Sequence, residues 1–147
     1  MNRDQLEHLF PNLRSTAYEI TSPRSTRYNC AAYVAGDADR WWWPEAHPNS
    51  YWPGSRRDES LDAIVEVFGN LGYEVCDSPT LESGFEKIAI YVDDLGPQHL
   101  ARQLPSGMWS SKCGRLEDIT HTLEGLDGEE YGKAHFIMKR RCSAGLS

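Results

Sequence analysis

Cys30 and His99 are the two residues of this sequence whose chemistry is most readily defined. A thiol attacks as its thiolate, which a nearby imidazole or the first turn of a helix favours. The stretch RYNCAAYVAGD predicts a short helix that begins near Cys30 and ends at Gly36, and His99 opens a predicted strand over 98–104. The pair is a candidate nucleophile and base. A small buried core thiol and a structural histidine are the alternatives, and both stay open.

A third group would have to orient the imidazole, and hairpin geometry narrows the search for it. The PSG turn at 105–107 pairs the flanking strands so that partner numbers sum to about 212, which places His99 opposite Cys113. No carboxylate or amide adjoins Cys113, and the nearest acids follow the next glycine. We therefore predict Asp118 as the orienting group, with an ordinary acid in the first turn of a helix as its alternative.

An aromatic loop with three prolines spans residues 41–55. Tryptophan offers a large, stiff face with a polar edge, which suits a sugar ring or a peptide. The same loop could instead cover the sheet and fill part of the core. The predicted substrate-binding residues are Asn29, Trp41, Trp42, Trp43, Trp52 and Gln103, the last as a candidate donor to an oxyanion.

Hydrophobic spacing predicts the elements that must position these side chains. We expect helices within 1–20 and over 30–36, 60–73 and 116–126, and strands over 87–93, 98–104, 108–114 and 133–140. The predicted fold is α+β, an antiparallel meander of about four strands with the helices on one side. Residues 1–147 form a single domain in which 1–24 are an N-terminal helix and linker and 141–147 are a frayed tail.

Five short motifs carry a resemblance to known families. They are YNC (28–30), WWWP (41–44), KIAIY (87–91), HLARQL (99–104) and WSSK (109–112). The chain is similar to an uncharacterised, mainly bacterial domain family, and that resemblance implies no reaction. A cysteine on an early helix followed by a histidine on an antiparallel sheet also resembles papain-like and NlpC- or CHAP-like thiol hydrolases. This second resemblance implies a papain-like arrangement, although the sequence lacks their glutamine before the cysteine and their Gly-Ser-Cys-Trp signature.

Composition excludes several classes of function. A net charge of −7 is unfavourable for binding a phosphate backbone, so no nucleic acid is expected as a partner. No apolar run approaches the ~20 residues of a membrane span, and the acidic N-terminus does not resemble a signal peptide, so we expect a cytoplasmic protein without membrane contact. Cys30, Cys76, Cys113 and Cys142 form no CxxC pair, and no metal or cofactor is predicted.

The predicted function is a cysteine hydrolase or acyltransferase that acts on an amide or peptide-type bond. The Cys30 thiolate would attack, His99 would carry the proton, and backbone N–H groups near Cys30 would stabilise the oxyanion. The alternative is a non-catalytic binding module in which the loop over 41–52 recognises a ligand or a partner protein.

Overall fold

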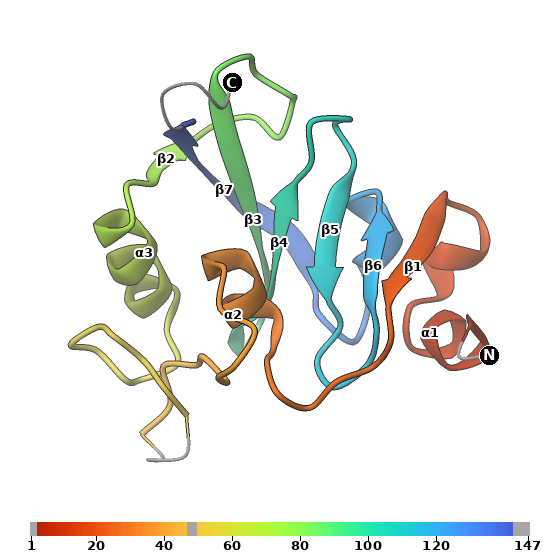
Figure 1. Cartoon of the computed structure of the whole chain (residues 1–147), viewed down its shortest axis with the longest axis horizontal. Coiled ribbons are helices and arrows are strands. Elements are labelled where there is room, and N and C mark those ends of the chain that lie inside the picture. Colours follow the sequence, from red (N-terminus) through yellow and green to blue (C-terminus); the bar gives the residue numbers. More distant parts are fainter. Residues whose placement is uncertain (1–2, 47–49, 143–147) are drawn as a thin grey trace.

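The computed structural model describes residues 3–46 and 50–142, which form an antiparallel sheet of seven strands with a few short helices (Figure 1). The strands lie in the order β1-β6-β5-β4-β3-β7-β2. Their bounds are β1 (Tyr18–Ser22), β2 (Glu74–Cys76), β3 (Phe85–Asp93), β4 (Gly96–Gln103), β5 (Trp109–Lys112), β6 (Asp118–His121) and β7 (Lys133–Arg141). The helices are α1 (Arg3–Leu9), α2 (Cys30–Ala35) and α3 (Leu61–Asn70), with 3₁₀ turns η1 (Pro11–Arg14) and η2 (Glu124–Leu126).

Hydrophobic clusters lie on both faces of the sheet. Successive side chains of a strand point to opposite faces, so Ile90 and Leu100 pack under α2 and α3 in one cluster. Tyr91 and Ala101, their neighbours in sequence, belong to a second cluster with residues of α1, η1 and η2. Figure 1 shows α2 in front of β3 and β4, with α1 beyond β1. Helical segments therefore cover both faces of the sheet.

The predicted fold class is wrong. The sheet has seven strands rather than about four, its helices are short and lie on both faces, and its arrangement is not papain-like. The additional strands β1 and β2 are the two edges of the sheet and have only five and three residues. Such short segments show little periodicity, and their strand conformation depends on pairing with β6 and β7.

The predicted helix over 116–126 is also wrong. Ile119 and Leu126 enter the second core cluster as expected, but residues 118–121 form β6, paired with both β1 and β5. The β-branched Ile119 and Thr120 favour a strand once partners exist on both sides. The predicted linker within 1–24 contains β1, and Arg141 of the predicted tail ends β7. Residues 143–147 of that tail lie outside the described residues.

The helix that carries Cys30 follows the sequence prediction. Asn29 caps it, because its side chain accepts a hydrogen bond from the backbone N–H of Ala32. Gly36 ends it with φ of 88°, a left-handed conformation that glycine adopts without steric cost. The start of α2 is thus determined locally, and its packing on β4 places Cys30 over the sheet.

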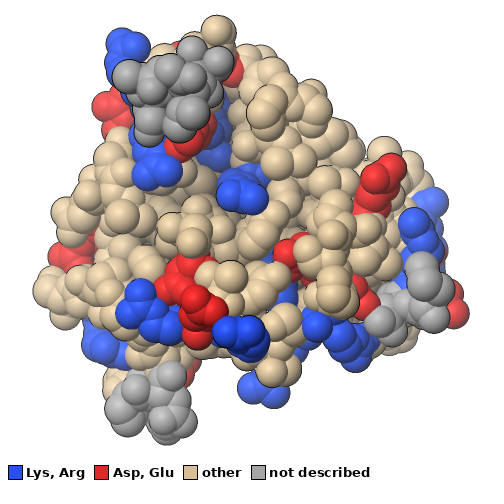
Figure 2. Space-filling model, in the orientation of Figure 1, with Lys and Arg blue, Asp and Glu red and all other residues tan. Residues whose placement is uncertain are grey.

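Basic and acidic side chains alternate over the face seen in Figure 2. Ion pairs of the protein include Arg27 with Asp39 and Arg56 with Asp58. Among the helices of the described ranges, none combines the length and the apolar composition that a bilayer crossing needs.

Candidate functional site

A pocket of about 230 Å³ lies between the aromatic loop and the first residues of β4. Five of the predicted site residues line it: Asn29, Cys30, Trp41, Trp43 and His99. Glu45, Gln98, Gly114 and Tyr131 complete the lining. The fold thus brings the predicted thiol and imidazole to one pocket, together with two of the tryptophans.

Asn29 connects α2 to the aromatic loop. Its Oδ1 accepts from the backbone N–H of Trp42 at 3.0 Å as well as from Ala32, and its Nδ2 donates to the Trp42 carbonyl at 2.7 Å. Asn29 is buried, so these bonds fix the loop against the start of the helix. Asn29 lines the pocket, and its main role there is to hold the helix of Cys30 and the tryptophan loop in place.

The Cys30 thiol is buried and protonated at neutral pH. Burial raises its pKa to about 11, against the opposing influence of the backbone N–H groups of Leu100, Ala31 and Cys30 itself and of the Lys112 ammonium. Leu100 is outside the β4–β5 ladder, in which Arg102 pairs with Ser110 and Gln103 pairs with Trp109. These donors would hydrogen-bond the sulfur better as a thiolate than as a thiol.

His99 is completely buried, and neither ring nitrogen has a hydrogen-bond partner among the described residues. The ring stacks on Tyr131, with centroids 4.0 Å apart and planes at 5°, and meets Tyr91 edge-on at 5.4 Å. Burial, with a smaller contribution from His121, holds the pKa of His99 well below its ordinary value, so the imidazole is neutral.

Cys30 and His99 approach the pocket from different faces of the sheet. Cys30 packs with Leu100 in the cluster under α2, whereas His99 pairs with Tyr91 and contacts rings of the second cluster. Within the described chain, no hydrogen bond joins the thiol to the imidazole. The predicted pairing of His99 with Cys113 lies beyond the end of the β4–β5 ladder.

Asp118 lies beside Tyr28 rather than beside the imidazole. Its Oδ2 accepts from the Tyr28 hydroxyl at 2.9 Å, and its Oδ1 has no partner in the described parts of the chain. Asp118 pairs across the β5–β6 ladder with Lys112, whose ammonium donates to the carbonyls of Ser25, at 2.7 Å, and Gly114. The structure therefore does not bring Asp118 to His99. It places the buried Lys112 beside Asp118, where the lysine also acts on the Cys30 thiol.

The three consecutive tryptophans have different environments. Trp42 is buried in the core, and its Nε1 donates to Asp37 at 2.9 Å. Trp41 and Trp43 are half-buried and line the pocket. Trp52 is buried against Trp42 and lines a neighbouring cavity with Trp41. The loop therefore both fills the core and walls the pocket, although residues 47–49 at its tip lie outside the described residues.

The comparison with family models matches residues 19–139 to the family described as "Domain of unknown function (DUF7689)". The chain belongs to this family. The matched range runs from β1 into β7 and contains every residue that lines the pocket of this DUF7689 chain. Searches of the curated proteins and of the solved structures find no match.

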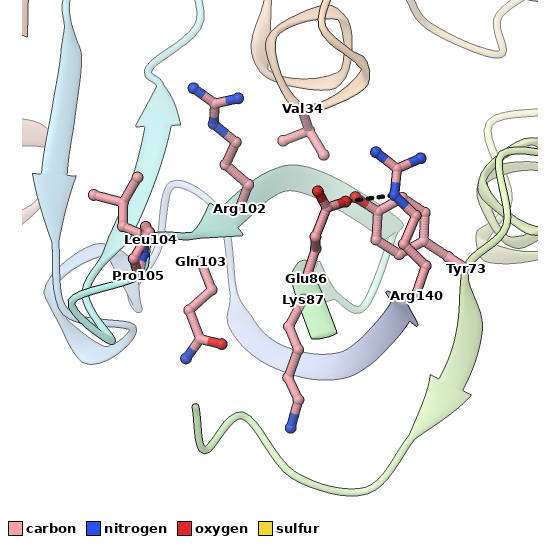
Figure 3. Close-up of a pocket in the computed structure, with 9 residues that line it drawn as sticks. All are labelled: Val34, Tyr73, Glu86, Lys87, Arg102, Gln103, Leu104, Pro105 and Arg140. Carbon is pink, nitrogen blue, oxygen red and sulfur yellow. Dashed lines mark hydrogen bonds and ion pairs between the residues drawn. The ribbon is translucent and has the colours of Figure 1, made fainter. Parts of the chain in front are cut away.

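Gln103 of the DUF7689 chain lies in a different pocket, of about 310 Å³, at the far end of β4. Figure 3 shows its side chain directed, like that of Lys87, away from Glu86 and Arg140. Its Nε2 donates to the Pro79 carbonyl at 2.8 Å. Gln103 is thus not brought together with Cys30, and the N–H groups that act on the thiol are those of the backbone.

Sequence reasoning missed Tyr131, Glu45 and Lys112 as parts of the site. Tyr131 sits in the turn before β7, and no periodicity marks it as the ring that stacks on His99. The sequence drew attention to Lys112, because this residue ends the WSSK motif. Its complete burial was not predicted, because a lysine is almost never fully buried without a specific partner. Within the described ranges, no three His, Cys, Asp or Glu side chains come close enough to hold a metal ion.

Proposed function

We propose that this DUF7689 chain binds a small polar ligand in the pocket beneath the aromatic loop, with His99 as the group that hydrogen-bonds it. The observation that carries the proposal is the lack of a partner for both His99 nitrogens among the described residues. A buried polar atom without a partner costs about 1–3 kcal/mol, and a hydrogen bond from a bound ligand would offset that cost.

The chemistry of the ligand follows from the state of the imidazole. A neutral ring has one N–H donor and one lone-pair acceptor. An amide, an alcohol or a protonated amine could satisfy one or both of them. Trp41, Trp43 and Tyr131 supply flat faces for the body of the ligand.

A ligand screen with one histidine variant and one control variant tests this proposal. Small amides, alcohols and amines would be screened against the wild type by ligand-observed NMR. Binding should disappear in His99→Phe and persist in Gln103→Leu, which alters the other end of β4. Hits that bind His99→Phe as well as the wild type would refute the assignment of this pocket.

Cysteine-dependent acyl transfer is the second candidate, and a specific observation favours it. The thiol lies in the same pocket as the imidazole, and three backbone N–H groups and Lys112 act on its sulfur. In this reaction the thiol proton passes to His99, and the sulfur attacks the carbonyl carbon of an amide or peptide-type bond. His99 then protonates the leaving amine, and water or an acceptor amine cleaves the thioester and restores the thiol.

This second candidate requires a rearrangement, since no hydrogen bond joins Cys30 to His99 within the described chain. Asp118 as orienting group would likewise have to leave Tyr28. Iodoacetamide labelling over a range of pH, read at each cysteine by mass spectrometry, separates the two functions. A catalytic Cys30 labels rapidly below the ordinary thiol pKa of ~8.5 and slows in His99→Ala. With a pKa of about 11, a Cys30 that serves only binding labels more slowly than the half-buried Cys76.

A further inference from the structure

We infer that the ligand of this pocket is a cation, a small amine or a lysine-like side chain, held by Glu45 and the faces of Trp41 and Trp43. The inference rests on the proposed function and adds the charge of the ligand to it. Three properties of the lining support it: its formal charge, its aromatic walls and the neutral state of its histidine.

The formal charge of the lining is negative. Glu45 is the one acidic residue among the nine described residues that line the pocket, and none of them is a lysine or arginine. The ammonium of the buried Lys112 is already engaged, because it donates to the carbonyls of Ser25 and Gly114. The lining itself therefore offers an anionic ligand a carboxylate and no lysine or arginine.

The Glu45 carboxylate retains capacity for a ligand. Its Oε1 accepts from the Ser50 hydroxyl at 2.9 Å, which fixes the side chain from the loop side. A carboxylate offers about four acceptor sites on its two oxygens, so one hydrogen bond leaves room for an ammonium. Glu45 is half-buried, so solvent screens an ion pair here less than it does on the open surface.

Aromatic walls and a neutral histidine also suit a cation. The negative face of an indole attracts an ammonium within about 6 Å of the ring centre. Trp41 and Trp43 line the pocket. The guanidinium of Arg115 lies over the Trp41 ring, 5.8 Å from its centroid, so one cation of the chain itself already meets this indole. The neutral His99 does not repel a positive charge and can accept an N–H from it.

The size of the pocket limits the ligand. Its volume of about 230 Å³ is below the ~300–1,000 Å³ of sites for drug-sized molecules. One side chain or a small free amine fits. The pocket in Figure 3 has the opposite character, since Lys87, Arg102 and Arg140 line it against the single acid Glu86.

Three probes of similar length test the charge of the ligand. They are N-acetyl-lysinamide, its neutral norleucine counterpart and its acidic glutamate counterpart, titrated against the full chain by calorimetry. We expect the lysine probe to bind at least about tenfold more tightly than the norleucine probe. Glu45→Gln should remove most of that preference, whereas Glu74→Gln, the same charge change on the exposed edge strand β2, should leave it intact.

Each other outcome overturns the inference in a distinguishable way. If the norleucine or glutamate probe binds as tightly as the lysine probe and His99→Phe abolishes that binding, the proposed function stands and the cationic ligand is refuted. Binding that survives His99→Phe occurs elsewhere, for example at the arginines of Figure 3, and supports neither statement. If no probe binds the wild type, the proposed function and the inference fall together.

Discussion

Replacing His99 by phenylalanine should stabilise the protein while it removes ligand binding. The imidazole has one N–H and one lone pair, and neither has a partner among the described residues. Phenylalanine removes both polar atoms and keeps an aromatic ring for the stack on Tyr131 and the edge contact with Tyr91.

The magnitude follows from the burial of the ring. Each unpartnered polar atom costs about 1–3 kcal/mol, and the neighbours of this completely buried ring have to accommodate the one extra ring atom of phenylalanine. We expect the free energy of unfolding to rise by about 1–3 kcal/mol, which corresponds to roughly 3 °C in Tm per kcal/mol for a chain of this size. Urea unfolding near neutral pH, followed by circular dichroism, measures the change.

His121 is the matched control, because it is equally buried and fully bonded. Its Nε2 accepts from the Ser111 hydroxyl at 2.7 Å, and its Nδ1–H donates to the Thr122 carbonyl at 2.6 Å. His121→Phe leaves two buried groups without partners and should destabilise the fold by about 2–4 kcal/mol. A loss of stability in His99→Phe comparable to that in His121→Phe would show that His99 is a structural residue, and the proposed function would lose its support.

Three further predictions concern the scaffold of the site. Acid should destabilise the fold between the ordinary histidine pKa of 6.5 and about 4. Burial lowers the pKa of His99 and that of His121, the latter to about 4, so in this pH range the unfolded chain binds protons that the folded chain does not. His99→Phe should reduce the loss of stability measured by urea titrations across this range, and an equally steep loss in the variant would contradict the prediction. Lys112→Met should lower the free energy of unfolding by about 2–4 kcal/mol, since it breaks two hydrogen bonds to carbonyl groups and leaves Asp118 buried without the lysine cation. Lys133→Met on the exposed surface is the control, and equal thermal stability of the two variants would refute the role of Lys112. Asn29→Ala should lower the free energy of unfolding by about 2–4 kcal/mol and make the pocket tryptophans more accessible to the quencher acrylamide. Asn29→Asp keeps the helix cap and should lose less stability. Unchanged tryptophan quenching in Asn29→Ala would contradict the role of Asn29 in holding the loop.

Local interactions explain the parts of the fold that could be predicted. The helix at Cys30 depends on a cap at Asn29 and a left-handed glycine at Gly36, both within its own segment. The hairpin register near the PSG turn is confirmed for Arg102 with Ser110 and Gln103 with Trp109, because a tight turn dictates the partners on either side of it.

Pairing between distant segments accounts for the parts that could not. β1, β2 and β6 become strands by pairing with segments far away in the chain, and the leucine spacing over 116–126 fits a helix as well as it fits the core that forms. The β4–β5 ladder also ends before His99, so extrapolating its register to Cys113 failed.

The sequence by itself determined the local elements that carry the candidate residues: a capped helix that begins at Cys30, a strand that has His99 near its start, and an irregular tryptophan loop interrupted by proline. Only the tertiary structure decided their chemical state. Whether a thiol or an imidazole is charged depends on burial and on the dipoles and charges around it, and those come from segments far apart in the chain. Burial keeps the Cys30 thiol protonated against the opposing influence of the Leu100 N–H. Burial also keeps His99 neutral beneath the ring of Tyr131, and neither of its nitrogens has a partner in the described chain.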